Sequence, residues 1–486
     1  MQAAAGPSFP QIDRAPLNRR QRGLLVAAVL GTMMEFFDFF IIAYVLNIIA
    51  KPWSLSAAQS GFLLISAGVA SIVGAIAFGA LADRIGRRHV FQITLLTYAL
   101  ATGAMAAVPE GNWLLLGALR FLVGLGVGGL VVVDVPLVQE FVPSSKRGQL
   151  GGLVVMFIPV GSILGSLSAA FLAPYIGWRG LVLLGLLPAV LSLYVRFSVK
   201  ESPTWLLSRG RVAEARESVA WVLGISEADV ELPPSAPPRA AGTWRHMLRY
   251  RRSVAFTWLN SLALQFPFYG IILWGPALVS ILLGLEPAAA ARLMIVVNVC
   301  GFAGRILAGR LSEALGRRRT GMLFMGMAAA LLASTALLHD RTVLGVSAFF
   351  LGLAASWFFL DGSFVVALPY WAELFPTEVR STGTGSAYGI GGLGKVFGPA
   401  VLVVISGAGT AITPAATNSA VLPTFLLFAV VTFVGMLTYA FLGIETRGLS
   451  IAELDALLNR QRVGPQEEPG PANPTVPAHA TKDGRA

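Results

Sequence analysis

Apolar stretches of about 20 residues or more recur along the whole chain, and short polar segments separate them. At a rise of about 1.5 Å per residue, each stretch is long enough to cross a bilayer as a helix. The pattern predicts roughly 12 membrane spans in two sets. The first set comprises 22–50, 57–81, 89–108, 112–139, 149–174 and 178–198. The second comprises 253–282, 288–311, 320–338, 343–372, 383–408 and 422–443.

A basic phrase occurs twice, at Gly79–Arg88 and at Gly309–Arg318, each time between the second and third spans of a set. The two copies lie about half a chain apart, as expected for a duplicated membrane bundle. The predicted fold class is therefore an all-α membrane protein with two pseudo-symmetric six-helix bundles. The predicted organisation is an N-terminal tail at 1–21, bundles at 22–198 and 253–443, a central loop at 199–252, and a partly disordered tail at 444–486.

Composition supports a lipid environment for these helices. The chain is 55% hydrophobic and 13% charged, whereas soluble domains carry about 25% charged residues. The net charge of +11 lies mainly in the N-terminal tail, the central loop and the loops on the same side. By the positive-inside rule, this places both termini in the cytoplasm of a cell whose inner membrane the chain spans. We therefore predict lipid as a partner, no nucleic-acid partner, and a monomer.

Residues for enzymatic chemistry are missing from the pattern. Cys300 is the single cysteine, so an intramolecular disulfide and a cysteine-based metal site are excluded. The four histidines fall in loops, caps or tails. No nucleophile–base pair, metal-ligand spacing or nucleotide-binding loop is present. We predict that the protein is not an enzyme, and that it uses a proton gradient rather than a cofactor or a metal.

Several further motifs, together with the paired phrase, resemble those of the major facilitator superfamily over nearly the whole chain. Arg120–Gly129 resembles the signature of the fourth span, and the motif at Glu140–Arg147 recurs at Glu373–Arg380. Lys200–Pro203 and Glu445–Gly448 resemble the marks that follow the sixth and twelfth spans in the sugar-porter branch. The resemblance implies a transporter that works by alternating access, with one bundle rocking against the other.

Acidic and basic residues recur at equivalent helix ends of the two halves, where charge-assisted pairs can form. By resemblance and placement, we expect them to close the cytoplasmic face in the outward-open state. The alternative is that the arginines only anchor the topology and the acids are solvated. The predicted gate residues are Asp83, Arg87, Arg88, Asp134, Glu140 and Arg147 in the first half, and Glu313, Arg317, Arg318, Glu373 and Arg380 in the second.

Charges inside the predicted spans indicate the functional core, because a charge in the bilayer is costly and usually faces a cavity or a partner. Glu35 and Asp38 lie three residues apart on one face of the first span. Arg120 in the fourth span lies at a depth similar to that of Asp38. By resemblance to proton symporters, protonation of Asp38 is expected to release Arg120, with Glu35 as the competing proton carrier. The alternatives are a permanent ion pair and a hydrogen-bonded Glu35.

A lysine near the middle of the eleventh span, Lys395, requires an anion. That anion is either the substrate or a carboxylate of the protein, with Asp361 in the tenth span as the candidate. The seventh span brings an aromatic, weakly polar wall to the cavity region, which suits a flat solute; the alternative for each residue is helix packing. The wall residues are Gln265, Phe266, Tyr269 and Trp274.

The stretch 151–161 of the fifth span has no Gln or Asn, which argues against a sugar, because polyols require many neutral hydrogen-bonding groups. The phrase around Glu35 and Asp38 resembles that of metabolite–proton symporters, and the span around Lys395 resembles that of aromatic-acid and niacin carriers. The predicted function is import of a small organic acid, an aromatic or carboxylate metabolite, by proton symport. The alternatives are a sugar or neutral-metabolite symporter, a drug–proton antiporter and a transporter-like substrate sensor.

Overall fold

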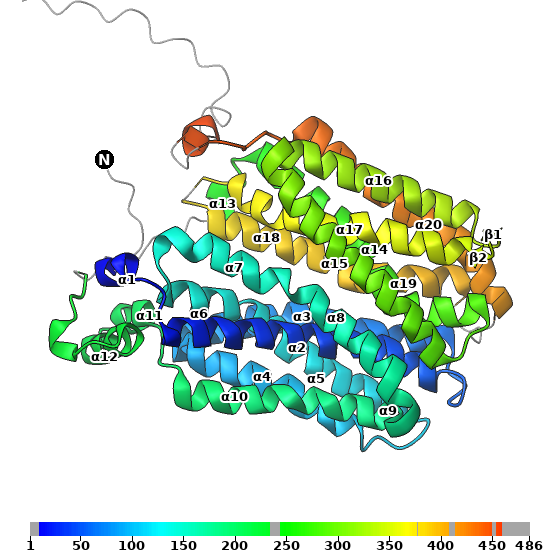
Figure 1. Cartoon of the computed structure of the whole chain (residues 1–486), viewed down its shortest axis with the longest axis horizontal. Coiled ribbons are helices and arrows are strands. Elements are labelled where there is room, and N and C mark those ends of the chain that lie inside the picture. The colour runs from blue at the N-terminus through cyan, green and yellow to red at the C-terminus, as the bar shows by residue number, and fades with distance from the viewer. Residues whose placement is uncertain (1–8, 234–243, 377, 408–413, 450–452, 459–486) are drawn as a thin grey trace, which may run out of the picture.

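The structure, a computed structural model, describes residues 9–233, 244–376, 378–407, 414–449 and 453–458. Within these ranges, some side chains are not described: those at 131, 135, 144, 147–149, 192–194, 196–198 and 414. The described chain is almost entirely helical. Figure 1 shows two bundles of long, roughly parallel helices lying side by side, with the earlier part of the chain in one and the later part in the other. We call them the first and the second half.

The first half is built from consecutive helices that run back and forth along the long axis. They are α2 (Arg19–Ile49), α3 (Ala57–Ile85), α4 (Arg87–Met105), α5 (Trp113–Val131), α6 (Asp134–Phe141), α7 (Arg147–Met156), α8 (Ile158–Leu167), η2 (Ser168–Leu172), α9 (Ala173–Leu183), η3 (Leu184–Leu186) and α10 (Leu187–Ser198). The second half repeats this plan. Its elements are α14 (Arg251–Leu283), α15 (Pro287–Leu315), α16 (Arg317–Leu337), α17 (Ala348–Glu373), α18 (Arg380–Gly392), α19 (Gly394–Ser406), α20 (Pro414–Leu437) and η5 (Thr438–Leu442).

Short elements lie at the two ends of these bundles. They are α1 (Pro10–Arg14), η1 (Ser144–Lys146), α11 (Pro203–Ser208), α12 (Val212–Leu223), η4 (Glu227–Asp229), α13 (Trp244–Met247) and the strands β1 (Thr342–Val343) and β2 (Val346–Ser347). In Figure 1, α1, α11, α12 and α13 lie at one end of the molecule, and the hairpin β1–β2 lies at the other. We call these the terminal end and the far end.

Ten helical stretches of the described chain are long and apolar enough to cross a membrane. One of them, 150–191, includes Gly177, where a positive φ of 63° turns the chain, and it therefore covers the fifth predicted span and the start of the sixth. The third predicted span corresponds to α4. The predicted all-α fold class is confirmed, and all twelve predicted spans fall on helices.

Several predicted spans differ from the structure in detail, among them the tenth and the fourth. The span at 343–372 begins later than expected, at Ala348, because Leu344 and Gly345 adopt positive φ angles and form the turn of the β1–β2 hairpin. Thr342 pairs with Ser347 in that hairpin. The span at 112–139 is not one continuous helix, because it is interrupted between α5 and α6.

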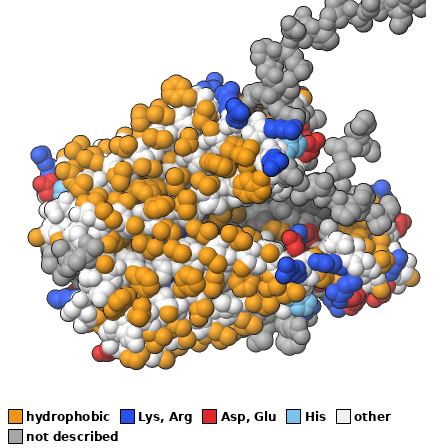
Figure 2. Space-filling model, turned by 180° about the vertical axis from the view of Figure 1, so that it is seen from behind, with side chains coloured by type: hydrophobic (Ala, Val, Ile, Leu, Met, Phe, Trp, Pro, Cys, Tyr) orange, Lys and Arg blue, Asp and Glu red, His pale blue; other side chains and the backbone are white. Residues whose placement is uncertain are grey.

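The surface of the bundles is suited to lipid. Figure 2 shows hydrophobic side chains spread over the face between the two ends, whereas charged side chains gather at the ends. The two halves meet where α2 packs on α14, α8 packs on α15 and α3 packs on α19. On the face shown in Figure 2, a hollow separates the halves toward the terminal end. The contact between the two halves therefore runs along these three helix pairs.

Close helix packing inside the first half depends on small residues, and this generates a test. A Cβ atom on Gly128 of α5 would overlap the backbone carbonyl of Ser71 in α3. The change Gly128→Ala should therefore destabilise the fold by about 1–3 kcal/mol, as overpacking does elsewhere. Thermal unfolding in detergent measures the effect. Gly389→Ala is the matched control, since a Cβ atom there meets nothing within 4 Å. An equal loss of stability in both variants would contradict this packing.

Candidate functional site

At the terminal end, the first half is fastened by a cluster that we call the first-half latch: Arg87, Glu140, Glu201 and Ser202. The guanidinium of Arg87 pairs with Glu140, which also accepts from the Ser202 hydroxyl. One carboxylate oxygen of Glu201 accepts from the backbone N–H groups of Arg87 (2.9 Å) and Arg88 (3.0 Å). These groups begin α4, so the carboxylate satisfies free donors at the positive end of a helix.

The second half repeats this arrangement in a cluster that we call the second-half latch: Arg317, Glu373, Glu445 and Thr446. Arg317 Nε lies 3.4 Å from Glu373, whose other oxygen accepts from the Thr446 hydroxyl. Glu445 accepts from the backbone N–H of Arg317 at 3.0 Å. The repeated phrase at helix α3–α4 and α15–α16 therefore builds the same device twice.

A glycine is required at each latch. Gly86 and Gly316 have φ angles of 100° and 95°, a region that side chains disfavour. A Cβ atom at either position would also collide with the carboxylate of Glu201 or Glu445. The second glycine of the repeated phrase is thus explained by the carboxylate that caps the following helix.

The latches differ from the expected gate in what they join. Among pairs in which both side chains are described, their bonds connect helices of one half to each other and to the segment that follows that half. None crosses to the other half. Their closing role in an outward-open state therefore stays a prediction.

Other predicted gate residues lie near the latches with various contacts. The carbonyl of Asp83 accepts from the indole of Trp205 at 2.9 Å, while its side chain is exposed. Glu313 is also exposed, and Arg318 donates to the Tyr439 carbonyl at 3.0 Å. Arg380 pairs with Asp455 at 3.4 Å. The side chain of Arg147 lies outside the described residues.

Asp134 was expected in the gate, and it is the most buried of the predicted acids there. Its side chain is buried inside the first half, where it accepts from the hydroxyl of Thr32 in α2 at 2.9 Å. It also interacts electrostatically with Glu35, one turn along α2 from Thr32. The break between α5 and α6 ends just before Asp134, and a role of Asp134 in the gate stays a prediction.

Asp38 and Arg120 are neighbours, as predicted, and both are fully buried. Their contact differs from the expected ion pair. The guanidinium donates to the backbone carbonyls of Asp38 (3.1 Å) and Phe39 (3.0 Å). The Asp38 carboxylate instead accepts from Thr102 of α4 at 2.6 Å, and its second oxygen has no partner among the described residues. Protonation of Asp38 would therefore not release Arg120 by breaking a direct bond between the side chains.

Lys395 lies where the two halves meet, at the start of α19 just after the break in the eleventh span. Its ammonium is within 6 Å of the ring centres of Phe39, Tyr269 and Tyr388, at 5.7, 5.5 and 5.6 Å. It also donates a long bond of 3.4 Å to the hydroxyl of Ser71 in α3. Three aromatic faces can attract a cation, but Lys395 makes no ion pair with any described residue.

Glu35 is the acid associated with this lysine. It is buried in α2, and neither of its carboxylate oxygens has a hydrogen-bond partner among the described residues. Glu35 and Lys395 interact electrostatically, as do Glu35 and Asp134. A buried carboxylate without partners is costly, so Glu35 is placed to exchange a proton or to respond to a charge that enters beside it.

The expectation that Asp361 serves Lys395 is wrong. Both carboxylate oxygens of Asp361 accept from Arg305 of α15, at 2.9 and 2.7 Å, and both side chains are buried. Arg305 was missed in the sequence, although it interrupts a predicted span. Counting residues from the terminal end would have found it, because Arg305 and Asp361 lie at similar depths in α15 and α17.

The four predicted wall residues of the seventh span make their contacts in different places. Tyr269 packs against Phe39 and belongs to the lysine cage, with ring centres 5.8 Å apart. Phe266 packs instead on Phe428 of α20, within the second half. Gln265 bonds to Ser261 and fills the break in the eleventh span, and Trp274 donates to the Pro399 carbonyl at 2.9 Å. Only Tyr269 of the four contacts Lys395.

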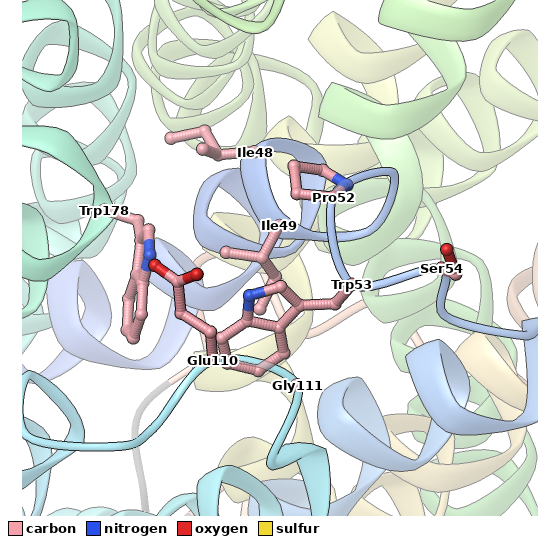
Figure 3. A pocket seen from close by; sticks show the side chains of 8 residues that line it. All are labelled: Ile48, Ile49, Pro52, Trp53, Ser54, Glu110, Gly111 and Trp178. Carbon is pink, nitrogen blue, oxygen red and sulfur yellow. The ribbon is translucent and has the colours of Figure 1, made fainter.

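Two cavities lie near the far end, away from this cluster. One, of about 660 Å³, is lined from both halves by the ends of α2 and α14, and Trp274 forms part of its wall. The other, of about 510 Å³, lies within the first half, and Figure 3 shows Trp53 and Trp178 around it with Glu110. The second cavity does not touch the second half, so it carries no argument for a path between the halves. Among the described residues, no group of three or more His, Cys, Asp or Glu side chains could hold a metal ion.

Comparison with known proteins identifies the family of this architecture. Residues 24–458 match the family model described as sugar (and other) transporter. The chain belongs to this family. The niacin transporter NiaP of Acinetobacter baylyi is 30% identical over 460 residues, which cover 91% of this chain and 98% of that protein. The cis,cis-muconate transport protein of the same species is 27% identical over 395 residues, covering 79% of this chain and 87% of the relative.

A solved structure shows the same fold. The xylose transporter XylE from E. coli, in an inward open conformation, superposes with a TM-score of 0.70 at 20% sequence identity. The match covers 90% of this chain and 99% of that one. The protein is thus a membrane-embedded secondary transporter of the major facilitator type for a small molecule, and not an enzyme, as the sequence predicted.

The latches generate a second test. Glu201→Ala leaves the backbone N–H groups of Arg87 and Arg88 without their acceptor, and hydrogen bonds to a charged group are worth about 1.5–3 kcal/mol. Local opening of the turn before α4 should increase about tenfold or more. Trypsin, which cleaves after arginine, should then cut there faster in folded protein. Glu227→Ala, at an exposed acid of η4, is the control. Equal cleavage rates would show that Glu201 does not hold this turn.

Proposed function

We propose that this transporter imports a small organic acid, with an aromatic carboxylate as the preferred class, together with protons. The terminal end would face the cytoplasm and the chain would lie in the inner membrane, because the basic residues concentrate in that end. The proton gradient would be the source of energy, and the cycle would alternate access between the two ends.

The observation that carries this proposal is the environment of Lys395. The ammonium is buried at the junction of the halves, surrounded by three aromatic rings and without an ion pair among the described residues. A carboxylate of the substrate would supply the missing anion. Rings from α2, α14 and α18 would then contact a flat solute from both halves.

The printed names of relatives support the same chemistry. Niacin and cis,cis-muconate, named for two relatives, both carry carboxylates, and niacin is aromatic. A sugar would leave Lys395 without an anion, because it is neutral. An uncharged apolar drug would also leave Lys395 without an anion. These considerations favour an organic acid over the alternative solutes.

Coupling to protons would occur through Glu35. In its charged form Glu35 attracts Lys395 and competes with an incoming carboxylate. When Glu35 takes up a proton, Lys395 is left free for the anion, so proton and substrate would bind together. Asp38 was the first expectation for this role. Its carboxylate accepts a hydrogen bond from Thr102, so a change at Lys395 would affect Asp38 less than it affects Glu35.

Removal of the lysine charge tests the substrate class. In proteoliposomes with an inward proton gradient, Lys395→Gln should reduce uptake of an aromatic carboxylate such as niacin about tenfold or more, because one buried charge pair with the substrate is lost. Lys395→Arg should retain part of the activity. Lys146→Gln, at an exposed lysine of the terminal end, is the control for loss of charge alone.

A panel of solutes decides between the classes. Carboxylates should compete with labelled niacin in the unaltered protein, whereas their neutral amides and sugars should not. Efficient uptake of a neutral sugar, together with indifference to acids and to Lys395→Gln, would reject an organic-acid carrier.

The proton assignment is tested with neutral isosteres. Glu35→Gln imitates the protonated acid, so exchange of labelled for unlabelled substrate should continue while gradient-driven accumulation falls to the level reached without a gradient. Asp38→Asn should retain accumulation. Uptake driven by an imposed pH difference and counterflow exchange measure the two activities. The reverse pattern would transfer the proton to Asp38.

A further inference from the structure

The buried pair of Arg305 and Asp361 is not needed for the proposed chemistry at Lys395. The pair joins α15 to α17, both in the second half, and its two bonds of 2.9 and 2.7 Å use two donor groups of the guanidinium. The side chains are only 2% and 3% exposed. A fork-shaped guanidinium has five N–H donors, so Asp361 leaves others available for a further contact.

One of those donors crosses to the first half. Arg305 Nη1 lies 3.3 Å from the backbone carbonyl of Val155, near the end of α7. Carbonyls inside a helix usually accept from the N–H four residues later. For Val155 that residue is Pro159, which has no N–H. The proline thus removes the usual helical donor to this carbonyl in the fifth span, and an arginine of the other half donates to it.

The helix geometry agrees with this origin of the acceptor. α7 ends at Met156 and α8 begins at Ile158, so the helix is interrupted within one turn of Val155. The same pair of spans makes a second polar contact closer to the far end. There Asn298, seven residues before Arg305 on the same face of α15, donates to the Ser162 carbonyl at 3.4 Å.

Arg305 lies at the edge of the contact between the halves that is nearest the terminal end. It is ten residues from the end of α15 at Leu315, roughly 15 Å along the helix. Asn298 lies between it and the far end. Among pairs with both side chains described, no hydrogen bond or ion pair joins the halves closer to the terminal end than Arg305 and Val155. A tilt that separates the halves further at the terminal end would therefore act first on this bond.

We propose that Arg305, held by Asp361, is a positioning residue of the transport cycle that ties the halves together in the state of this structure, and that Pro159 creates its acceptor. The bond forms when α15 lies against α7 and breaks when the halves tilt further apart at the terminal end. Asp361 compensates the arginine in both states, so the bond to Val155 alone reports the change. This inference concerns the conformational balance and does not depend on the substrate or on the proton site.

The decisive variant is Pro159→Ala, which leaves Arg305 and Asp361 unchanged. Alanine supplies an N–H that can bond the Val155 carbonyl, so the arginine loses its preferred acceptor. Loss of a hydrogen bond to a charged group should change the ratio of the two states about tenfold toward wider opening of the terminal end. Pro423→Ala is the matched control, because Pro423 is an exposed proline inside α20.

Distances between spin labels measure the ratio in liposomes without substrate or gradient. The single cysteine of the chain is first replaced by Cys300→Ser. Labels at Arg84→Cys and Ala314→Cys, both exposed positions, report the terminal end. Labels at Lys51→Cys and Glu286→Cys report the far end, where both residues line the cavity between the halves. Pro159→Ala should lengthen the first distance and should not lengthen the second.

A double-mutant cycle separates a tie from a general effect on the helix. The neutral pair Arg305→Gln with Asp361→Asn should shift the populations in the same direction, and Pro159→Ala should add little in that background. Additive effects, or equal shifts from Pro159→Ala and Pro423→Ala, would overturn the inference. No shift from Pro159→Ala would overturn it as well, even where the neutral pair fails to fold.

Discussion

A charged side chain near the middle of a bilayer has to be compensated by the protein, because neither lipid nor the helix interior solvates it. Much of this structure follows from how that requirement is met. Arg120 is compensated by carbonyls of α2, and Arg305 by Asp361 and a carbonyl of α7. Lys395 has aromatic faces and one hydroxyl. It is the least compensated of the three, and the proposed substrate site rests on that difference.

The latches of the terminal end are largely a consequence of local sequence, and this is why they were predictable. Their arginines and acids recur at equal spacing in both halves, and the glycine before each helix leaves space for a capping carboxylate. The sequence could not tell that Glu201 and Glu445 cap backbone groups of their own half. Adjacency in a duplicated motif indicates which residues interact, but not whether a bond lies within a bundle or between bundles.

The interior was predicted less completely, for a different physical reason. Depth along a helix identified Asp38 and Arg120 as neighbours, yet depth does not specify which atoms meet. Arg120 donates to two backbone carbonyls, which a residue of any type would have supplied. The sequence therefore does not indicate which acceptors the arginine uses. Asp361 was assigned to the wrong cation, because Arg305 was overlooked in an apolar span. The break between α5 and α6 just before Asp134 likewise depends on how the two helices pack.

Contacts to carbonyls and contacts to carboxylates respond differently to a proton, and this distinction organises the buried charges. The bonds of Arg120 and Arg305 to backbone oxygens keep their strength at any pH, since a carbonyl does not titrate. A contact between Glu35 and Lys395 depends on protonation. Under the proposed mechanism, the first kind of contact can therefore set the relative position of helices within one state, whether or not a proton is bound. The second kind can carry the coupling, because a single proton on Glu35 changes the charge that Lys395 presents to an anion.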